Sequence, residues 1–364
     1  MTEVLHPREA ARVAGPDEAV SLDELALAAR NHGMPLEALR FDLTPPGLHY
    51  LLVHYDIPFV DPATWRLEVG GHVSAPLSLS LDDLRARPAV SRTVTLECAG
   101  NGRARLLPRP VSQPWLDEAV GTARWTGCAL SSLLAAAGVR DGAVDVAFTG
   151  ADHGTERGVE QDYRRALPIA EALSDDVVLA YEMNGAPLPP QHGAPVRLIV
   201  PGWYGMAQVK WLSSVDVLTE PFTGYQNEVA YRLRASADDP GVPVSHIQPR
   251  ALVVPPGFPD FMTRRRIVDA GTVPLFGRAW SGRAALTRVE VSVDGGASWA
   301  PAVLGEPAGR FAWRGWTFSW AATPGEYRLC VRAVDEFGAQ PVEQPWNMQG
   351  MANNTVQRVA VTVR

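Results

Sequence analysis

The chain has 364 residues and a formal net charge of −7, with 33 Lys and Arg against 40 Asp and Glu. This length suits two domains, each large enough to bury a core. The acidic balance offers no basic surface for nucleic acid or an anionic membrane, so neither partner is expected. No apolar run approaches the ~18 residues of a membrane span. The 32 Gly and 31 Pro favour many turns and short strands over an all-helical fold.

The N-terminal run MTEVLHPREAARVAG carries charges where a secretory signal needs an apolar stretch. We therefore expect a cytoplasmic location, and a periplasmic one only if a leader has been removed. The three cysteines are Cys98, Cys128 and Cys330. Because they are odd in number and far apart, they argue against a disulfide framework.

Three helices are predicted in the first part of the chain. SLDELALAAR begins with a capping box in which Ser21 pairs with Glu24. A second short helix is expected after Ser80, and a third spans Leu130–Ala137 and ends at Gly138.

Strands are predicted where β-branched and apolar runs end in Gly, Pro or Asp. These runs are WRLEVGGHV, RTVTLECAG, VDVAFTG, VRLIVPG and VKWLSSVDVL. Helices and strands mix without a regular alternation, so residues 1–245 are predicted to form an α+β domain.

The pattern changes after the Pro-rich connection DDPGVPVSHIQPR. Valines alternate ahead of Asp294-Gly295-Gly296, which is a hairpin signal, and apolar residues alternate again over 327–333. Residues 246–364 are therefore predicted to form an all-β, immunoglobulin-like sandwich. The basic run 264–266 is interpreted as a solvated turn rather than a nucleic-acid patch.

The most informative segment is the strand that runs into Cys98-Ala99-Gly100-Asn101-Gly102-Arg103. Small residues after the cysteine let sulfur and backbone amides approach a ligand closely. Three interpretations stay open on these residues alone. Cys98 is a small buried hydrophobe, a nucleophile whose thiolate is favoured by Arg103 and Arg105, or a soft ligand for a metal. A nucleophile would need a base from elsewhere in the chain.

Several separated motifs, in order, resemble the sulfite oxidase family, which also contains the assimilatory nitrate reductases. CAGN followed by Arg, then Pro114-Trp115 and ARWTG, are similar to the family's metal loop. YEMNGAPLPPQHGAPVRLIVPG and VKWL are similar to its pterin-binding stretch. GRAWSG, VSVDGGASW, WRGW and WNMQGMANN are similar to its dimerisation domain.

The resemblance implies a role for particular side chains. It makes Cys98 the protein ligand of molybdenum, bound with one molybdopterin per chain. Tyr231 matches the tyrosine beside the metal, with Tyr225 as the alternative register. Trp115 and Arg103 match pocket residues. The set that holds the pterin and its phosphate is His192, Arg197 and Lys210, whose side chains are suitable phosphate donors.

Two positions depart from the family pattern. His54 stands where the family has a substrate-binding arginine, and Gln349 replaces a residue that is arginine in sulfite oxidases. The substrate pocket is therefore predicted to bind sulfite weakly. Protonation of His54 near its ordinary pKa of ~6.5 would then improve oxyanion affinity as the pH falls. The remaining histidines, His49 among them, lack metal-ligand spacing and are interpreted as structural or exposed.

The resemblance implies a molybdenum-dependent oxidoreductase that couples oxygen-atom transfer to the transfer of two electrons. Sulfite to sulfate is the default reaction, and the alternative is reduction of an S-oxide, N-oxide or nitrate on the same cofactor. The sequence shows neither a haem-binding module nor a Rossmann fingerprint, so no haem is expected in this chain. A separate electron carrier, such as a small cytochrome, is expected instead. A homodimer is expected through the sandwich.

Overall fold

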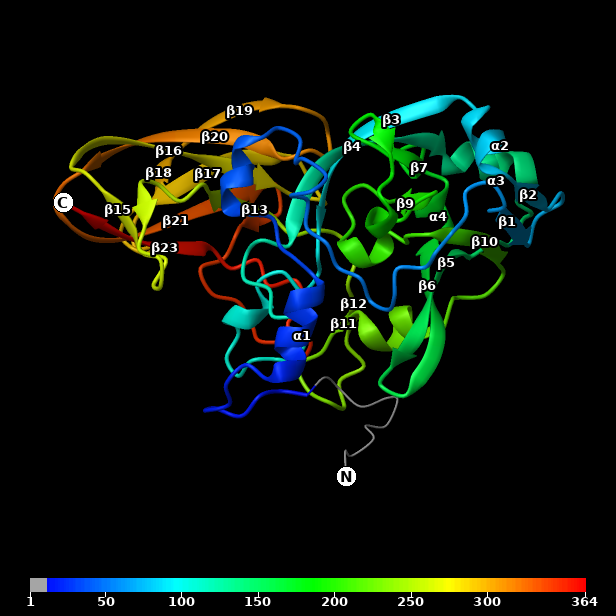
Figure 1. Cartoon of the computed structure of the whole chain (residues 1–364), viewed down its shortest axis with the longest axis horizontal. Helices are drawn as coiled ribbons and strands as arrows, with labels where there is room; N and C mark the ends of the chain where they lie inside the picture. Colours follow the sequence, from blue (N-terminus) through cyan, green and yellow to red (C-terminus); the bar gives the residue numbers. More distant parts are fainter. Residues whose placement is uncertain (1–11) are drawn as a thin grey trace.

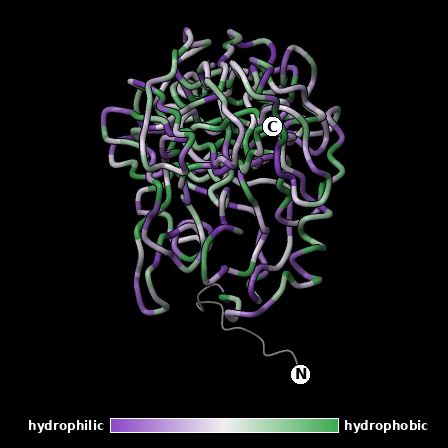
Figure 2. The backbone as a smooth tube through the Cα atoms, turned by 90° about the vertical axis from the view of Figure 1, so that its left-hand side faces the viewer, coloured by the Kyte–Doolittle hydropathy of each residue, from purple (hydrophilic) through white to green (hydrophobic). Residues whose placement is uncertain are grey.

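The computed structural model describes residues 12–364, and the first residues of the N-terminal run lie outside this range. Two lobes built mainly from strands lie side by side, with short helices on the first lobe (Figure 1). Seen from the side, hydrophobic stretches gather within the densely packed part of the molecule where the sheets lie (Figure 2). Among the described residues, no helix is long and apolar enough to cross a membrane.

The first lobe contains two larger sheets, ordered β2-β1-β10-β5-β6 and β3-β4-β7-β8, with β9 also paired to β7, and a two-stranded sheet, β11-β12. Its strands are β1 (Leu67–Gly71), β2 (Leu77–Leu79), β3 (Ala89–Glu97), β4 (Val120–Ala129), β5 (Asp145–Glu156), β6 (Val159–Pro168), β7 (Val178–Met183), β8 (Ala186–Pro187), β9 (Arg197–Ile199), β10 (Leu212–Leu218), β11 (Arg232–Leu233) and β12 (Val242–Pro243). Its helices are α1 (Leu22–Arg30), η1 (Leu36–Arg40), α2 (Leu81–Arg85), η2 (Arg103–Arg105), α3 (Leu130–Ala137), α4 (Ile169–Ala172), η3 (Pro190–His192), η4 (Gly205–Ala207) and the π-helix η5 (Gln226–Ala230).

The predicted helix ends are confirmed. Ser21 caps α1, because its hydroxyl accepts the amide of Glu24 at 3.2 Å. α3 ends at Gly138, whose φ of +67° lies in the left-handed region that glycine adopts without a steric penalty. The mixed strand and helix content confirms the α+β class for this part of the chain.

The second lobe is an all-β sandwich, as predicted. One sheet is ordered β13-β16-β20-β19, and the other β14-β15-β23-β21-β17-β18, with β22 paired to β21. Its strands are β13 (Arg250–Val253), β14 (Phe258–Pro259), β15 (Arg266–Val268), β16 (Gly271–Trp280), β17 (Leu286–Ser292), β18 (Ala300–Pro301), β19 (Val303–Pro307), β20 (Arg314–Ala322), β21 (Gly325–Asp335), β22 (Gly338–Ala339) and β23 (Gln357–Val363). Alternate residues of both sheets supply its core, including Leu275, Val289 and Val331.

The architecture changes between β12 and β13, and a domain boundary at residue 245 stays a prediction. The interpretation of residues 264–266 as a solvated turn is wrong for Arg266, which is 7% exposed. Its guanidinium donates to the carbonyls of Pro255, Pro256 and Gly257, because a buried cation must keep its donors satisfied. All three cysteines are free and buried, so no disulfide forms among them.

Candidate active site

Cys98 lies directly after β3, in the loop that leads towards β4. Its amide donates to the carbonyl of Ala119 at 2.9 Å, and the amide of Gly100 donates to its Sγ at 3.4 Å. Burial raises the pKa of the Cys98 thiol, although Arg103 and the Gly100 amide act in the opposite direction. This environment argues against a free, reactive thiolate, so the interpretation of Cys98 as a nucleophile is not favoured.

Cys98 lines two adjoining pockets. The deeper one is lined by the three predicted basic residues His192, Arg197 and Lys210. The second is lined by Arg103, Trp115 and Gln349. His54 and Tyr231 line both pockets together with Cys98, so the fold brings all nine predicted site residues to one place.

The deep pocket is strongly electropositive and desolvated. Burial lowers the pKa of Lys210 to about 7 and that of Arg197 to about 10. The Lys210 ammonium donates to the carbonyls of Leu52 at 2.7 Å and Gln191 at 3.2 Å, and Arg197 donates to those of His192 and Gln208. An anion in this pocket would stabilise both cations.

The second pocket is lined by two arginines, Arg103 and Arg157, and the donors of Arg103 are partly committed. Arg103 is 7% exposed, and its Nε donates to the backbone carbonyl of Gln349 at 2.8 Å. Its Nη1 donates to the carbonyl of Gln113 at 3.2 Å. The guanidinium lies against Gly100, where a Cβ would come within 2.8 Å of it. The side-chain oxygen of Gln349 is buried without a partner, so this acceptor is available to a donor group of a ligand.

His54 and Tyr231 form a pair between the two pockets. The His54 Nε2 and the Tyr231 hydroxyl lie 2.8 Å apart, and the His54 ring packs 4.7 Å from that of Tyr163. Tyr225 lines neither pocket, so the structure places Tyr231 at the site. Burial lowers the pKa of His54 to about 4. The prediction that His54 gains charge just below neutral pH is therefore wrong.

The comparisons with known proteins agree with this geometry. The family model "Oxidoreductase molybdopterin binding domain" matches residues 54–226, and the family model "Mo-co oxidoreductase dimerisation domain" matches residues 250–364. The chain is 37% identical to sulfite oxidase of Gallus gallus, over 89% of this chain and 73% of that protein. The chain belongs to the sulfite oxidase family.

Other relatives show how broad this family is. Mitochondrial sulfite oxidase of Mus musculus is 37% identical over 88% of this chain, which spans 62% of that protein's length. Nitrate reductase [NADH] 1 of Oryza sativa is 32% identical over 88% of this chain and 38% of its own length. The crystal structure of the sulfane dehydrogenase SoxCD from Paracoccus pantotrophus superimposes with a TM-score of 0.79 at 25% identity, covering 96% of this chain and 94% of that one.

Membership of this family implies a molybdenum cofactor, and the deep pocket fits one. Arg197 Nε, His49 Nε2 and Asp152 Oδ1 are buried there without partners, although buried polar atoms are nearly always hydrogen-bonded. A group rich in donors and acceptors, with an anionic part near Lys210 and Arg197, would satisfy them.

Sequence reasoning missed Asp152, and it treated His49 as structural or exposed. Burial raises the pKa of Asp152 to about 6, and this carboxyl faces the deep pocket just after the apolar run VDVAFTG. That position at the end of a buried run was a signal that could have found it. His49 is 1% exposed, so of the two alternatives the exposed one does not apply. Its ring lies 5.5 Å from that of His192, on the pocket wall.

We expect the fold to be sensitive to mild acid. Burial lowers the pKa of His49 and of His54 to about 4, and that of His192 to about 2. In the unfolded chain these imidazoles titrate near ~6.5. The unfolded state therefore binds more protons below that pH, and the free energy of unfolding falls as the pH drops from ~6.5 towards ~4. For His54 alone the loss is about 2 kcal/mol at pH 5.

Urea unfolding at pH 7 and pH 5 measures this effect in wild type and in His54→Gln, whose amide can keep the contact with Tyr231. The variant should lose less stability than wild type between the two pH values. His153→Gln is the control, because His153 is exposed and its pKa is raised by Asp162 and Glu160. Equal pH dependence of wild type and His54→Gln would contradict the prediction.

Proposed function

We propose that this chain oxidises a small sulfur oxyanion, with sulfite as the default substrate, at a molybdenum centre bound by Cys98. The observation that carries the proposal is the position of this cysteine between a deep basic pocket and a second pocket that holds Arg103. The cofactor, one molybdopterin per chain, supplies the two-electron oxidation and the oxygen-atom transfer. Sulfite and water then give sulfate, two protons and two electrons.

The chain's own residues bind and orient the reactants. Arg197, Lys210 and His192 hold the pterin and its phosphate through charge-assisted and neutral hydrogen bonds. Arg103 attracts the substrate anion, and the indole of Trp115 closes the pocket beside it. The Tyr231 hydroxyl is held at the site by neutral His54, whose Nε2 lies 2.8 Å from it.

The electrons leave to a separate carrier protein in this proposal. The sequence contains no haem-binding module and no Rossmann glycine fingerprint, which supports a chain without haem of its own.

The test combines metal analysis with a substrate panel on protein from a host that makes the cofactor. We expect about one molybdenum and one pterin per chain, and sulfite-dependent reduction of an artificial acceptor. Absence of molybdenum contradicts the proposal. Reduction of an S-oxide, N-oxide or nitrate without any oxidation of sulfite would replace it by the reductase reaction.

We further propose that the chain forms a two-fold dimer through its second lobe. The match to the dimerisation domain supports this, as do exposed apolar side chains around the β14–β15 hairpin, where Phe261 is 80% and Met262 81% exposed. An isologous interface of this kind usually buries more than ~1,200 Å². Light scattering at micromolar concentration should give about twice the 39.4 kDa of one chain. A mass of one chain would rule the dimer out.

A further inference from the structure

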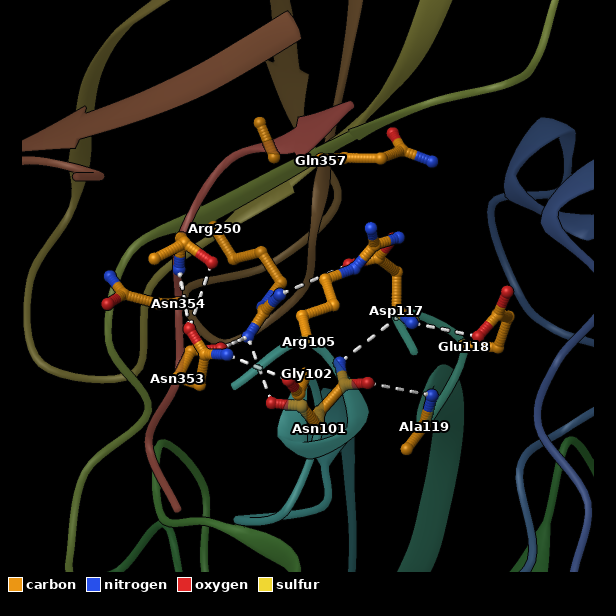
Figure 3. A network of polar contacts seen from close by, with 12 residues as sticks. Asn101, Gly102, Arg105, Asp117, Glu118, Ala119, Arg250, Asn353, Asn354 and Gln357 are labelled. Carbon is orange, nitrogen blue, oxygen red and sulfur yellow. Dashed lines mark hydrogen bonds and ion pairs between the residues drawn. The ribbon is translucent and has the colours of Figure 1, made fainter. Parts of the chain in front are cut away.

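A buried guanidinium from the second lobe lies beneath the Cys98 loop. Arg250, at the start of β13, is 1% exposed. Its Nε lies 2.7 Å from Oε1 of Glu97, and its Nη1 lies 3.8 Å from Oδ1 of Asp117. Its Nη2 donates to the carbonyls of Asn101 and Asn353, so a single side chain joins the two lobes (Figure 3).

Glu97 is the residue directly before Cys98, and it is 1% exposed. Its Oε1 also accepts the side-chain amide of Asn101 at 3.0 Å, and its Oε2 accepts the indole N–H of Trp280 at 2.7 Å. The carboxylate therefore links positions on both sides of the cysteine. A charge buried this completely requires its partner, because an unpaired carboxylate is costly away from water.

The second lobe also holds the loop through its backbone. The amide of Ala352 donates to the carbonyl of Ala99 at 2.7 Å, and the side-chain amide of Asn353 donates to that of Gly102 at 2.7 Å. Gly102 has a φ of +89°, and a Cβ there would come within 2.8 Å of the Asn353 carbonyl oxygen. This position requires glycine, since no larger residue fits so close to the backbone of Asn353 in the second lobe.

We propose that Arg250 is a positioning residue that fixes the Cys98 loop by pairing with Glu97, so that the second lobe takes part in holding the metal ligand as well as in dimerisation. The inference rests on the proposed role of Cys98. Arg250 lines neither pocket, so its effect passes through Glu97 and Asn101. Without the guanidinium, Glu97 loses its ion-pair partner in a buried site, and the loop opens so that water can replace it.

The three cysteines give a readout of loop opening that does not depend on turnover. All are buried, but only Cys98 belongs to this loop. Full-length wild type and Arg250→Met are purified from a host that makes the cofactor and from one that does not. Alkylation by iodoacetamide is followed for each cysteine by peptide mass spectrometry. In the cofactor-free samples, Cys98 of Arg250→Met should react at least about tenfold faster than in wild type. Cys128 and Cys330 should keep their rates.

Matched variants separate positioning from general destabilisation. Arg266→Met removes another largely buried guanidinium, whose partners are backbone carbonyls away from the Cys98 loop, so Cys98 should stay as unreactive as in wild type. Arg250→Lys keeps a positive charge beside Glu97 and should restore part of the protection. The double variant Arg250→Met, Glu97→Gln buries no unpaired charge and should fold, yet Cys98 should still react faster because the link is lost.

Two outcomes would overturn the inference. One is Cys98 reacting no faster in Arg250→Met than in Arg266→Met, and the other is equal acceleration of all three cysteines. Molybdenum content of the samples from the cofactor-making host tests the proposed function separately. Wild type without molybdenum would contradict the role of Cys98 as a ligand, whereas the alkylation pattern still decides whether Arg250 holds the loop.

Discussion

Cys98→Ser should leave a folded chain without measurable sulfite oxidation. Residues that only support a metal ligand typically cost ~10–100-fold in metal affinity or activity when replaced, so loss of the ligand itself should cost more. Serine is close in size to cysteine and fits the same loop. Its hydroxyl is a hard, weakly acidic donor that does not replace a soft thiolate. The measurements are the molybdenum and pterin content and the rate with an artificial acceptor.

Cys128→Ser is the matched control for this variant. Cys128 is fully buried at the end of β4, in the apolar core of the first lobe, and lines neither pocket. Placing a hydroxyl there should lower the melting temperature while the remaining folded protein keeps its metal and its turnover. If Cys98→Ser retained sulfite oxidation comparable to Cys128→Ser, Cys98 would not be the metal ligand.

The local features of the fold could be predicted because their causes are local. The Ser21–Glu24 capping box and Gly138 determined helix ends, and an apolar strand that ends in small residues pointed to Cys98. The pairing of Arg250 with Glu97 could not be predicted in this way. These residues are distant in the sequence, and nothing in either segment indicates that β13 lies beneath the loop after β3.

Among the pocket residues, too, some features could be predicted from the sequence and others could not. His192, Arg197 and Lys210 were predicted from motif order, and the fold does bring them together. The prediction of an ordinary pKa for His54 was wrong because this side chain is buried, against the rings of Tyr163 and Tyr231 from distant parts of the chain. A side chain is expected to have its ordinary pKa only where it stays exposed to solvent.

Restoring arginine to the substrate pocket should strengthen sulfite binding. A charge-assisted hydrogen bond to a buried anion is worth about 1.5 to 3 kcal/mol, against about half of that for a neutral amide. The gain per arginine is the difference between these two values, so at about 1.4 kcal/mol per decade Gln349→Arg should lower the KM for sulfite by about 3- to 10-fold. The double variant His54→Arg, Gln349→Arg should lower it by about 10- to 100-fold.

The structure gives a reason to expect that Gln349→Arg lowers the KM for sulfite. The Gln349 side-chain oxygen is buried and unpaired on the pocket wall, and the backbone carbonyl of this residue already binds Arg103. A guanidinium placed at position 349 would therefore lie near that of Arg103. The two cations repel one another in an empty pocket, and an oxyanion between them relieves the repulsion. The Gln349→Arg substitution should therefore strengthen sulfite binding without stabilising the free protein.

Steady-state sulfite oxidation at pH 7 and pH 8 measures the effect, with Gln349→Met as the control for side-chain length without charge. Because the His54 imidazole is neutral at both pH values, wild type cannot regain the missing charge by protonation in this range. Gln349→Met should bind sulfite no better than wild type. A KM for sulfite that is unchanged by either arginine variant, or already low micromolar in wild type, would show that the pocket is not a weakened oxyanion site.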